Sequence, residues 1–181
     1  MALGLATLVL VLGGCSEEPE PKFGPAEPSS PTGSESPSAR LPIEPTMPAA
    51  ATRNSAEGAE SFVGYWIRTV NFAQATGRAR TLESLNDIRC VGCRGVLKAI
   101  KEPYSNGGWI EGGEWIVGRL RELPPDYGAD WAAFATARTR PQTVRDGKGG
   151  SKHYPGGRFQ FYAYVAWDHG AWRMRWLRTP F

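Results

Sequence analysis

The strongest helical pattern in the chain lies between residues 56 and 76. Apolar side chains recur there at steps of three and four residues, as they do along one face of an α-helix: Phe62, Val63, Trp66, Ile67, Val70 and Ala73. Ser55 is suited to cap the first turn, and Gly77 readily adopts the left-handed conformation that ends many helices. The pattern therefore predicts one long helix over residues 56–76 with a buried face.

Two shorter helices are expected next. Thr81 is placed to cap a helix over residues 82–85, and a third helix is predicted over residues 91–100. Pro103 and the run Ser105-Asn106-Gly107-Gly108 should end that helix, because proline and glycine clusters interrupt helical periodicity.

After residue 108 the hydrophobic period changes to two, which indicates strands over residues 114–123 and 132–140. A longer strand places five apolar side chains on one face: Phe159, Phe161, Ala163, Val165 and Trp167. Asp168-His169-Gly170 predicts a tight turn, after which Trp172, Met174 and Trp176 should point inward from the returning strand.

This order of elements predicts an α+β fold. We expect three N-terminal helices packed on a curved, mostly antiparallel four-stranded sheet, in a cystatin-like cone that spans residues 51–181. A sheet curved around the long helix would enclose a conical pocket.

The chain begins with an apolar run, residues 2–12, followed by Gly13, Gly14 and Cys15. About 20 apolar residues are needed to span a bilayer, so this run suits the hydrophobic region of a signal peptide. A cysteine after small residues resembles a lipobox, where bacterial lipoproteins are cleaved and lipidated. We therefore expect residues 1–14 to be a signal peptide, and Cys15 to carry diacylglycerol and palmitate at the extracytoplasmic face of the cell membrane. The absence of a basic residue before the run departs from the pattern and suggests a start upstream of Met1.

A linker is expected over residues 15–50. Residues 17–48 hold nine prolines among Ser, Glu and Ala, and such a composition predicts a disordered spacer. Residues 16–48 carry six glutamates against two basic residues, a net charge of −4, whereas residues 49–181 carry 19 basic and 12 acidic residues, a net charge of +7. The positive charge is dispersed, so nucleic acid is not an expected partner.

Four segments look like one uncharacterised domain: Phe62-Val63-Gly64-Tyr65-Trp66, residues 71–77 (Asn-Phe-Ala-Gln-Ala-Thr-Gly), Cys90-Val91-Gly92-Cys93, and Asp168-His169-Gly170-Ala171-Trp172. They resemble the domain of unknown function 6318, found in actinobacterial lipoproteins, over roughly residues 45–181. The element order also resembles the nuclear-transport-factor-2-like, or SnoaL-like, cone proteins. The resemblance implies a lipidated, proline-rich N-terminus and no assigned activity. Arg78 departs from it, because an acidic residue is expected after Thr-Gly.

Cys90 and Cys93 are the cysteines that remain once Cys15 is lipidated. A four-cysteine zinc site needs a second pair, so no metal and no cofactor are expected. Outside the cytoplasm a structural disulfide is the default, here pinning the turn before the third helix. A redox dithiol at a helix N-terminus is the alternative, although no βαβ context surrounds the pair.

Aromatic residues are the remaining candidates for a site. A possible apolar pocket would be lined by Tyr65, Trp66, Asn71, Trp115, Phe159, Phe161, Trp167, Trp172 and Trp176. The competing interpretation is that these aromatics are simply the core of the sheet and that Asn71 only bonds nearby backbone.

No catalytic residue is predicted. The acids fall mostly in turns and loops, where carboxylates stay solvated and make poor general bases. We therefore expect a membrane-anchored module that binds an apolar small molecule or docks another envelope protein. The alternative is a cone-fold isomerase or dehydratase acting on a small apolar substrate, which would need a buried acid or histidine.

Overall fold

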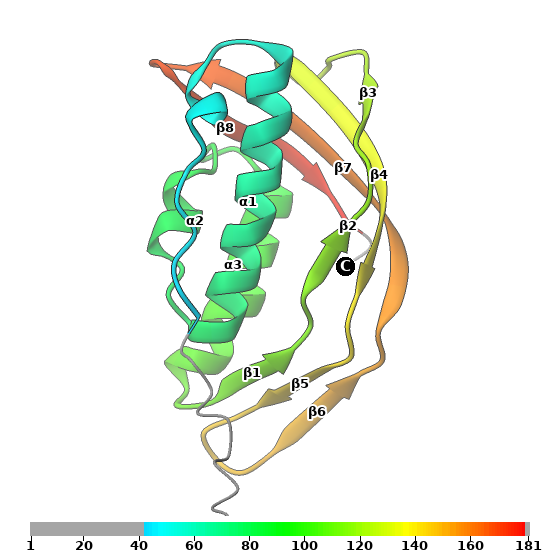
Figure 1. Ribbon diagram of the computed structural model, residues 1–181. Helices are drawn as coiled ribbons and strands as arrows, with labels where there is room; N and C mark the ends of the chain where they lie inside the picture. Colours follow the sequence, from blue (N-terminus) through cyan, green and yellow to red (C-terminus); the bar gives the residue numbers. More distant parts are fainter. Residues whose placement is uncertain (1–41, 180–181) are drawn as a thin grey trace, which may run out of the picture. The chain divides into compact units, whose positions relative to one another are not determined.

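The computed structural model describes residues 42–179, which lie in a compact unit that spans Arg40–Phe181. Helices and a curled antiparallel sheet form two layers, with the helices on the concave side of the sheet (Figure 1). The fold is therefore mixed α+β and consistent with the expected cone. The signal peptide and Cys15 lie outside the described residues. Residues 42–50, which the sequence assigned to the linker, belong to the compact unit and include the 3₁₀ helix η1 (Ala49–Thr52).

Helix α1 (Ala56–Thr76) confirms the predicted long helix at both ends. The Ser55 hydroxyl accepts a hydrogen bond from the Gly58 amide at 3.1 Å, and Gly77 ends the helix at φ 73°. Its buried face carries Phe62, Trp66 and Val70, each at most 1% exposed. Burial of this face against the sheet, rather than intrinsic propensity, stabilises the helix.

The two following helices differ in detail from prediction. Helix α2 (Arg80–Ser84) begins earlier and has no side-chain cap, because the Thr81 hydroxyl bonds the Glu44 carboxylate instead. Helix α3 (Val91–Ser105) runs five residues past the predicted end and contains Pro103. Pro103 lies in the last turn, and the amides of Asn106 and Gly108 donate to its carbonyl where the helix ends.

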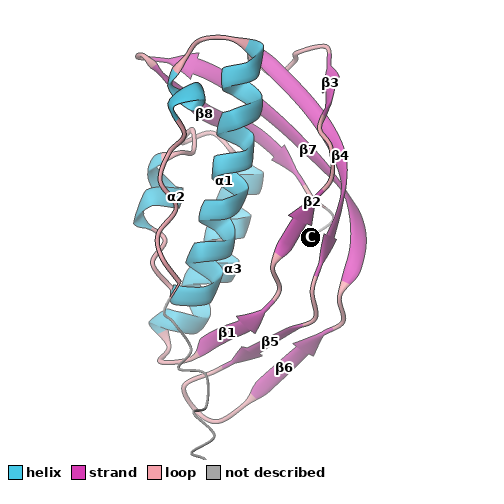
Figure 2. Ribbon diagram, in the orientation of Figure 1, coloured by secondary structure: helices cyan, strands magenta, loops and turns pink. Residues whose placement is uncertain are grey.

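Eight strands replace the four expected. They are β1 (Trp109–Gly112), β2 (Trp115–Val117), β3 (Arg121–Leu123), β4 (Trp131–Thr139), β5 (Gln142–Arg145), β6 (Ser151–Tyr154), β7 (Gly157–Asp168) and β8 (Ala171–Arg178). A five-stranded sheet has the order β2-β4-β7-β8, with β3 also paired to β4, and a three-stranded sheet has the order β1-β5-β6 (Figure 2).

The extra strands arise because three long strands each break at the same level. Gly112 and Gly113 separate β1 from β2, Arg140 and Pro141 separate β4 from β5, and residues 155–156 separate β6 from β7. Gly112 and Gly113 have φ 71° and 80°, and the Gly113 amide donates to the Pro141 carbonyl across the break. Left-handed backbone favours glycine and bends the strand. We refer to these three breaks together as the bend.

The predicted strand over 114–123 is also interrupted. Val117 pairs with Ala137 and Arg121 with Phe134, so three residues of one strand oppose two of the other. This extra residue is a bulge that splits the segment into β2 and β3.

The hairpin β7–β8 confirms the predicted turn, with His169 and Gly170 both at positive φ. A bulge between Tyr164 and Val165 in the pairing shifts the alternation of β8, so that Met174 opposes Val165 while Trp176 opposes Tyr164. Trp172 and Met174 point inward as expected. Trp176 was wrongly predicted to do so, because the extra residue Arg175 turns it to the outer face.

Among residues 42–179, none of the helices combines the length and apolar content that a membrane span requires.

We predict that the bend depends on Gly112. In Gly112→Ala a Cβ would lie 2.2 Å from the Pro141 carbonyl oxygen, in addition to the cost of φ 71°. Gly128→Ala is a matched control, since Gly128 has φ 68° and open space around it. We expect about 1 kcal/mol of lost unfolding free energy in the control and at least about twice that in Gly112→Ala, measured by denaturant titration. Equal losses would show that the close approach at the bend is unimportant.

Candidate functional site

A cleft of about 1020 Å³ lies between helix α3 and the inner face of the bent sheet. Helix α3 forms one wall, and β1, β5 and β6, with the end of β8, form the other. Half of its lining side chains are apolar or aromatic: Val91, Val96, Ala99, Ile100, Pro103, Ile110, Trp115, Val144, Tyr154, Pro155 and Leu177. The bend carries β5 and β6 away from the helices, whereas β1 still packs on both α1 and α3, and the cleft lies beyond β1.

Small residues on α3 leave the cleft open. Gly92, Gly95 and Ala99 all line it, and a Cβ built on Gly95 would have no neighbour within 4 Å. Glycine inside a helix costs roughly 1 kcal/mol relative to alanine. Gly92 is needed for packing, since a Cβ there would lie 2.2 Å from the Leu177 carbonyl oxygen. Gly95 has no such role.

A pair of side-chain amides also lines the cleft. Gln142 at the start of β5 donates through Nε2 to Oε1 of Gln74 on α1, at 3.0 Å. Gly113 makes room for this amide, because a Cβ there would lie 2.1 Å from the Gln142 Nε2. Gln74 is 7% exposed, and its buried Nε2 has no hydrogen-bond partner among the described residues. A buried polar donor without a partner is unusual in a folded protein.

Tyr104 joins the C-terminal ends of α1 and α3 beside this pair. Its hydroxyl donates to the Gln74 carbonyl at 2.5 Å, and its ring packs on Gly77. Burial raises the pKa of the Tyr104 hydroxyl above 10.0. The backbone of Gln74 is therefore held in place from both helices.

The charged residues that line the cleft lie mostly in solvent. Five of them are exposed: Glu102, Arg140, Asp146, Lys152 and Arg178. Arg140 pairs with Glu114 at 3.9 Å. Arg145 is half-buried, lies over the Trp109 ring at 5.4 Å, and has a buried Nε without a partner among the described residues. A hydrogen bond to Tyr154 raises the pKa of Lys152. The lining therefore contains no buried acid or histidine, and the described residues hold no cluster of three metal-ligating groups.

A second hollow, of about 770 Å³, lies at the N-terminus of α1. Its lining includes the exposed charged residues Glu57, Glu60, Arg119, Arg121 and Glu122. Mixed, solvated charges make this a poorer candidate for a small-molecule site than the apolar cleft.

Most of the aromatics considered for a pocket pack against one another, as the competing core interpretation holds. Trp66 and Phe161 are 0% exposed, and Trp115 and Phe159 are 6% and 9% exposed. Their rings meet at centroid distances of 5.5–6.5 Å, from Trp115–Phe159 at 5.5 Å to Trp66–Phe161 at 6.5 Å. Of the nine residues proposed, Trp115 alone is among the side chains that line the cleft.

Tyr65, Trp167 and Trp172 also belong to the core region, where Trp167 and Trp172 meet edge to face. Trp176 lies on the outer face, stacked on Tyr127 at 4.6 Å and against Tyr164 at 5.0 Å.

Asn71 forms hydrogen bonds with nearby backbone, which confirms the second of the two interpretations given for it. Its amide nitrogen donates to the Trp115 carbonyl at 2.9 Å, and its oxygen accepts from the Trp115 amide at 2.8 Å. The Asn71 side chain thus bonds both backbone groups of Trp115, as a paired strand would, and holds β2 against α1.

Gln74, Gln142 and Gly95 were missed in the sequence. Gln74 carried a signal, because it continues the buried stripe of Val63, Ile67 and Val70 at helical spacing, where a polar residue is unexpected. Gln142 follows a proline, and its sequence context gave no signal that it would line a cleft.

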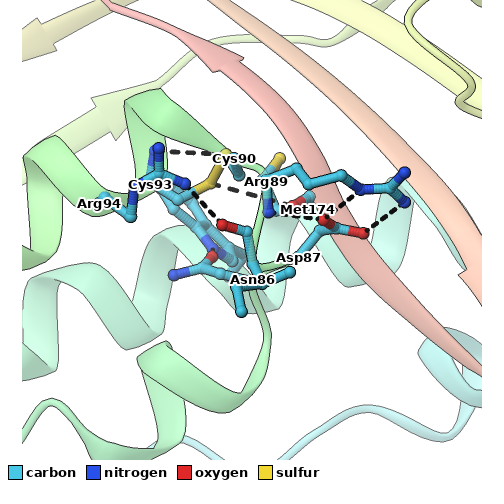
Figure 3. The surroundings of a disulfide bond; sticks show 9 residues. Asn86, Asp87, Arg89, Cys90, Cys93, Arg94 and Met174 are labelled. Atoms are coloured by element: carbon cyan, nitrogen blue, oxygen red, sulfur yellow. Dashed lines mark hydrogen bonds and ion pairs between the residues drawn. A yellow bond between two sulfur atoms is a disulfide. The ribbon is translucent and has the colours of Figure 1, made fainter.

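Cys90 and Cys93 form a disulfide at the start of α3, as predicted (Figure 3). Both are 0% exposed, and Cys93 lies beside the Met174 carbonyl of β8. Asp87 in the preceding turn bonds the same carbonyl through its amide and pairs with Arg89. Sulfurs shielded in this way are poorly accessible to thiol exchange, which favours the structural role over the redox one.

Comparisons with known proteins give one family by sequence and several solved structures that are similar to this chain. The model of a family of unknown function, DUF6318, matches residues 30–177. Among curated proteins, none matches the chain.

Three solved structures illustrate the similarity of fold. The intermembrane space region of the chloroplast protein ARC6 is 16% identical with a TM-score of 0.44, covering 70% of this chain and 97% of its own. A putative calcium/calmodulin dependent protein kinase II association domain from Xanthomonas campestris is 11% identical (TM-score 0.41; 77% and 94% covered). The beta subunit of a putative aromatic-ring-hydroxylating dioxygenase from Novosphingobium aromaticivorans is 11% identical (TM-score 0.42; 67% and 88% covered). Similarities at this level carry no function over to the chain.

We predict that the disulfide contributes to stability alone. Replacing both cysteines in Cys90→Ala/Cys93→Ala should lower the unfolding free energy by about 2 kcal/mol, because the loop that the bond closes is short. Denaturant titration of the oxidised chain and the double variant measures this difference. If stability were unchanged and the sulfurs reacted rapidly with a mild reductant in the native state, the structural role would be refuted.

Proposed function

This chain belongs to the DUF6318 family, a family of unknown function, and we propose that its compact unit is a non-catalytic module that binds an apolar small molecule between α3 and the bent sheet. The observation that carries the proposal is the cleft of about 1020 Å³, half of whose lining side chains are apolar or aromatic. Small-molecule sites are typically concave, of roughly 300–1,000 Å³, and combine apolar walls with a few placed polar groups. The Gln74–Gln142 pair supplies such polar groups.

The cleft suits binding better than catalysis. A cone-fold isomerase or dehydratase would need a general base whose pKa is tuned by burial. The acids that line this cleft, Glu102 and Asp146, are exposed, and Asp146 already accepts hydrogen bonds from the amides of Lys148 and Gly150. The residues present therefore support a binding role.

We further propose that a lipid on Cys15 anchors the chain at the extracytoplasmic face of the membrane. Cys15 lies outside the described residues, so the support is the apolar run of residues 2–12 and the small residues before the cysteine. An anchored module of this kind would meet lipids and other envelope proteins, which fits an apolar ligand.

Gly95 provides a direct test of the cleft. Gly95→Trp should place an indole in the cleft, since nothing lies within 4 Å of the new Cβ, and should abolish binding of the apolar fluorophore N-phenylnaphthylamine. Gly95→Ala is the matched control, with binding retained and the unfolding free energy raised by up to about 1 kcal/mol. Fluorescence titration measures the affinity, and thermal unfolding confirms that both variants fold. Equal affinity in the wild-type chain and Gly95→Trp would place the ligand elsewhere and refute the proposal.

The anchor has its own test. Metabolic labelling with a palmitate analogue should tag the wild-type chain and recover it in the membrane fraction of a bacterial host, whereas Cys15→Ser should be neither tagged nor retained. Cys90→Ser is the control, because it removes a cysteine of the compact unit. Palmitate labelling that persists in Cys15→Ser would refute the proposed anchor.

A further inference from the structure

We propose that the Gln74–Gln142 pair selects the ligand of the cleft, and that this ligand is an apolar chain carrying one uncharged group that donates and accepts hydrogen bonds, such as an amide or a hydroxyl. This inference rests on the proposed function and specifies the ligand class of the same site.

The first step is the unpartnered donor. Gln74 is 7% exposed, its Nε2 is buried, and no described residue accepts a hydrogen bond from it. Leaving a buried donor unpaired costs free energy, because the group has lost its hydrogen bonds to water. The side chain also lines the cleft, so an acceptor on a bound molecule would meet this need.

The second step is that the pair offers both hydrogen-bonding roles. Each primary amide has two N–H donors and one oxygen acceptor, and a single hydrogen bond joins the two side chains. If both amides were turned over, Gln74 would donate to Gln142, and the pair would still hold a free oxygen and free N–H groups. The complementary ligand group therefore both accepts and donates, whichever way the amides are turned.

The third step excludes a charged group. Gln74 is buried and neutral, and the lining cations Arg140, Lys152 and Arg178 are exposed. The fourth lining cation, Arg145, is half-buried, and its guanidinium lies over the Trp109 ring at 5.4 Å. A carboxylate beside Gln74 would lose its hydration without gaining a buried cation, which is unfavourable. The rest of the ligand is apolar, because Val96, Ile100, Ile110 and Val144 form the neighbouring walls.

The test compares four molecules with the same ten-carbon chain: decanamide, decanol, decanoate and decane. Each displaces N-phenylnaphthylamine from the full chain at neutral pH. We expect decanamide and decanol to bind about tenfold more tightly than decane, as one or two well-made hydrogen bonds provide. In Gln74→Met, which keeps the length of the side chain but removes its amide, this preference should vanish while binding of decane is retained. Gln160→Met is the matched control, because Gln160 is exposed on β7 and is not among the residues that line the cleft.

Each outcome is decisive. A preference that Gln74→Met abolishes and Gln160→Met preserves supports the inference. Equal affinities for all four molecules, tightest binding of decanoate, or a preference that survives Gln74→Met would overturn it and leave the proposed apolar site in place. If neither the fluorophore nor any of the four molecules bound the wild-type chain, the proposed function would fail as well.

Discussion

The structure depends on the shared bend of three long strands. At one level of the sheet, Gly112 and Gly113 take left-handed backbone angles, Pro141 interrupts the next strand, and Gly156 lies against Pro141. Hydrogen bonds continue across the break, from Gly113 to the Pro141 carbonyl and from Arg140 to the Glu114 carbonyl. The backbone therefore stays paired while its direction changes, and one curled surface results instead of two unrelated sheets.

The size of the side chains between the helices and the bent sheet differs from place to place, and this difference separates the core from the cleft. Against α1, the inner face of β4 carries Ala133, Ala135 and Ala137, whose small side chains leave room for Trp66 and the aromatic residues of β7. Around the cleft, α3 presents Gly95 and Ala99, whose small side chains fill little of the space, whereas Gly92 packs on Leu177 of β8. Large aromatic side chains fill the core beside α1, whereas the small residues of α3 leave the cleft unfilled.

The sequence predicted local features well and the bend poorly. The boundaries of α1, the His169–Gly170 turn and the inward set of β7 all follow from periodicity, capping and turn chemistry within a few neighbouring residues. The bend forms because three breaks that are distant in the chain lie side by side in the sheet. A local sequence pattern does not reveal this alignment. The inward prediction for Trp176 failed for the same reason, because the extra residue Arg175 is held by Asp87 at 2.8 Å, far away in sequence. The sequence did not locate the cleft, because the aromatic residues that suggested a pocket are packed in the core.

The Gln74–Gln142 pair links the bend to the proposed recognition of a ligand. Gln142 follows Pro141 at the break, and its side chain reaches Gln74 because Gly113 has none to block it. The same glycine thus permits the curvature and the polar group inside the cleft. An apolar cleft alone binds by area and discriminates weakly between chains, whereas a buried hydrogen-bonding group rejects ligands that leave it unpaired. Because the unpaired Gln74 amide is a cost of the empty protein, a ligand that satisfies it would stabilise the fold as it binds. Under the proposed function, stability and selectivity both depend on Gln74, a glutamine at a position that helical periodicity assigns to an apolar residue.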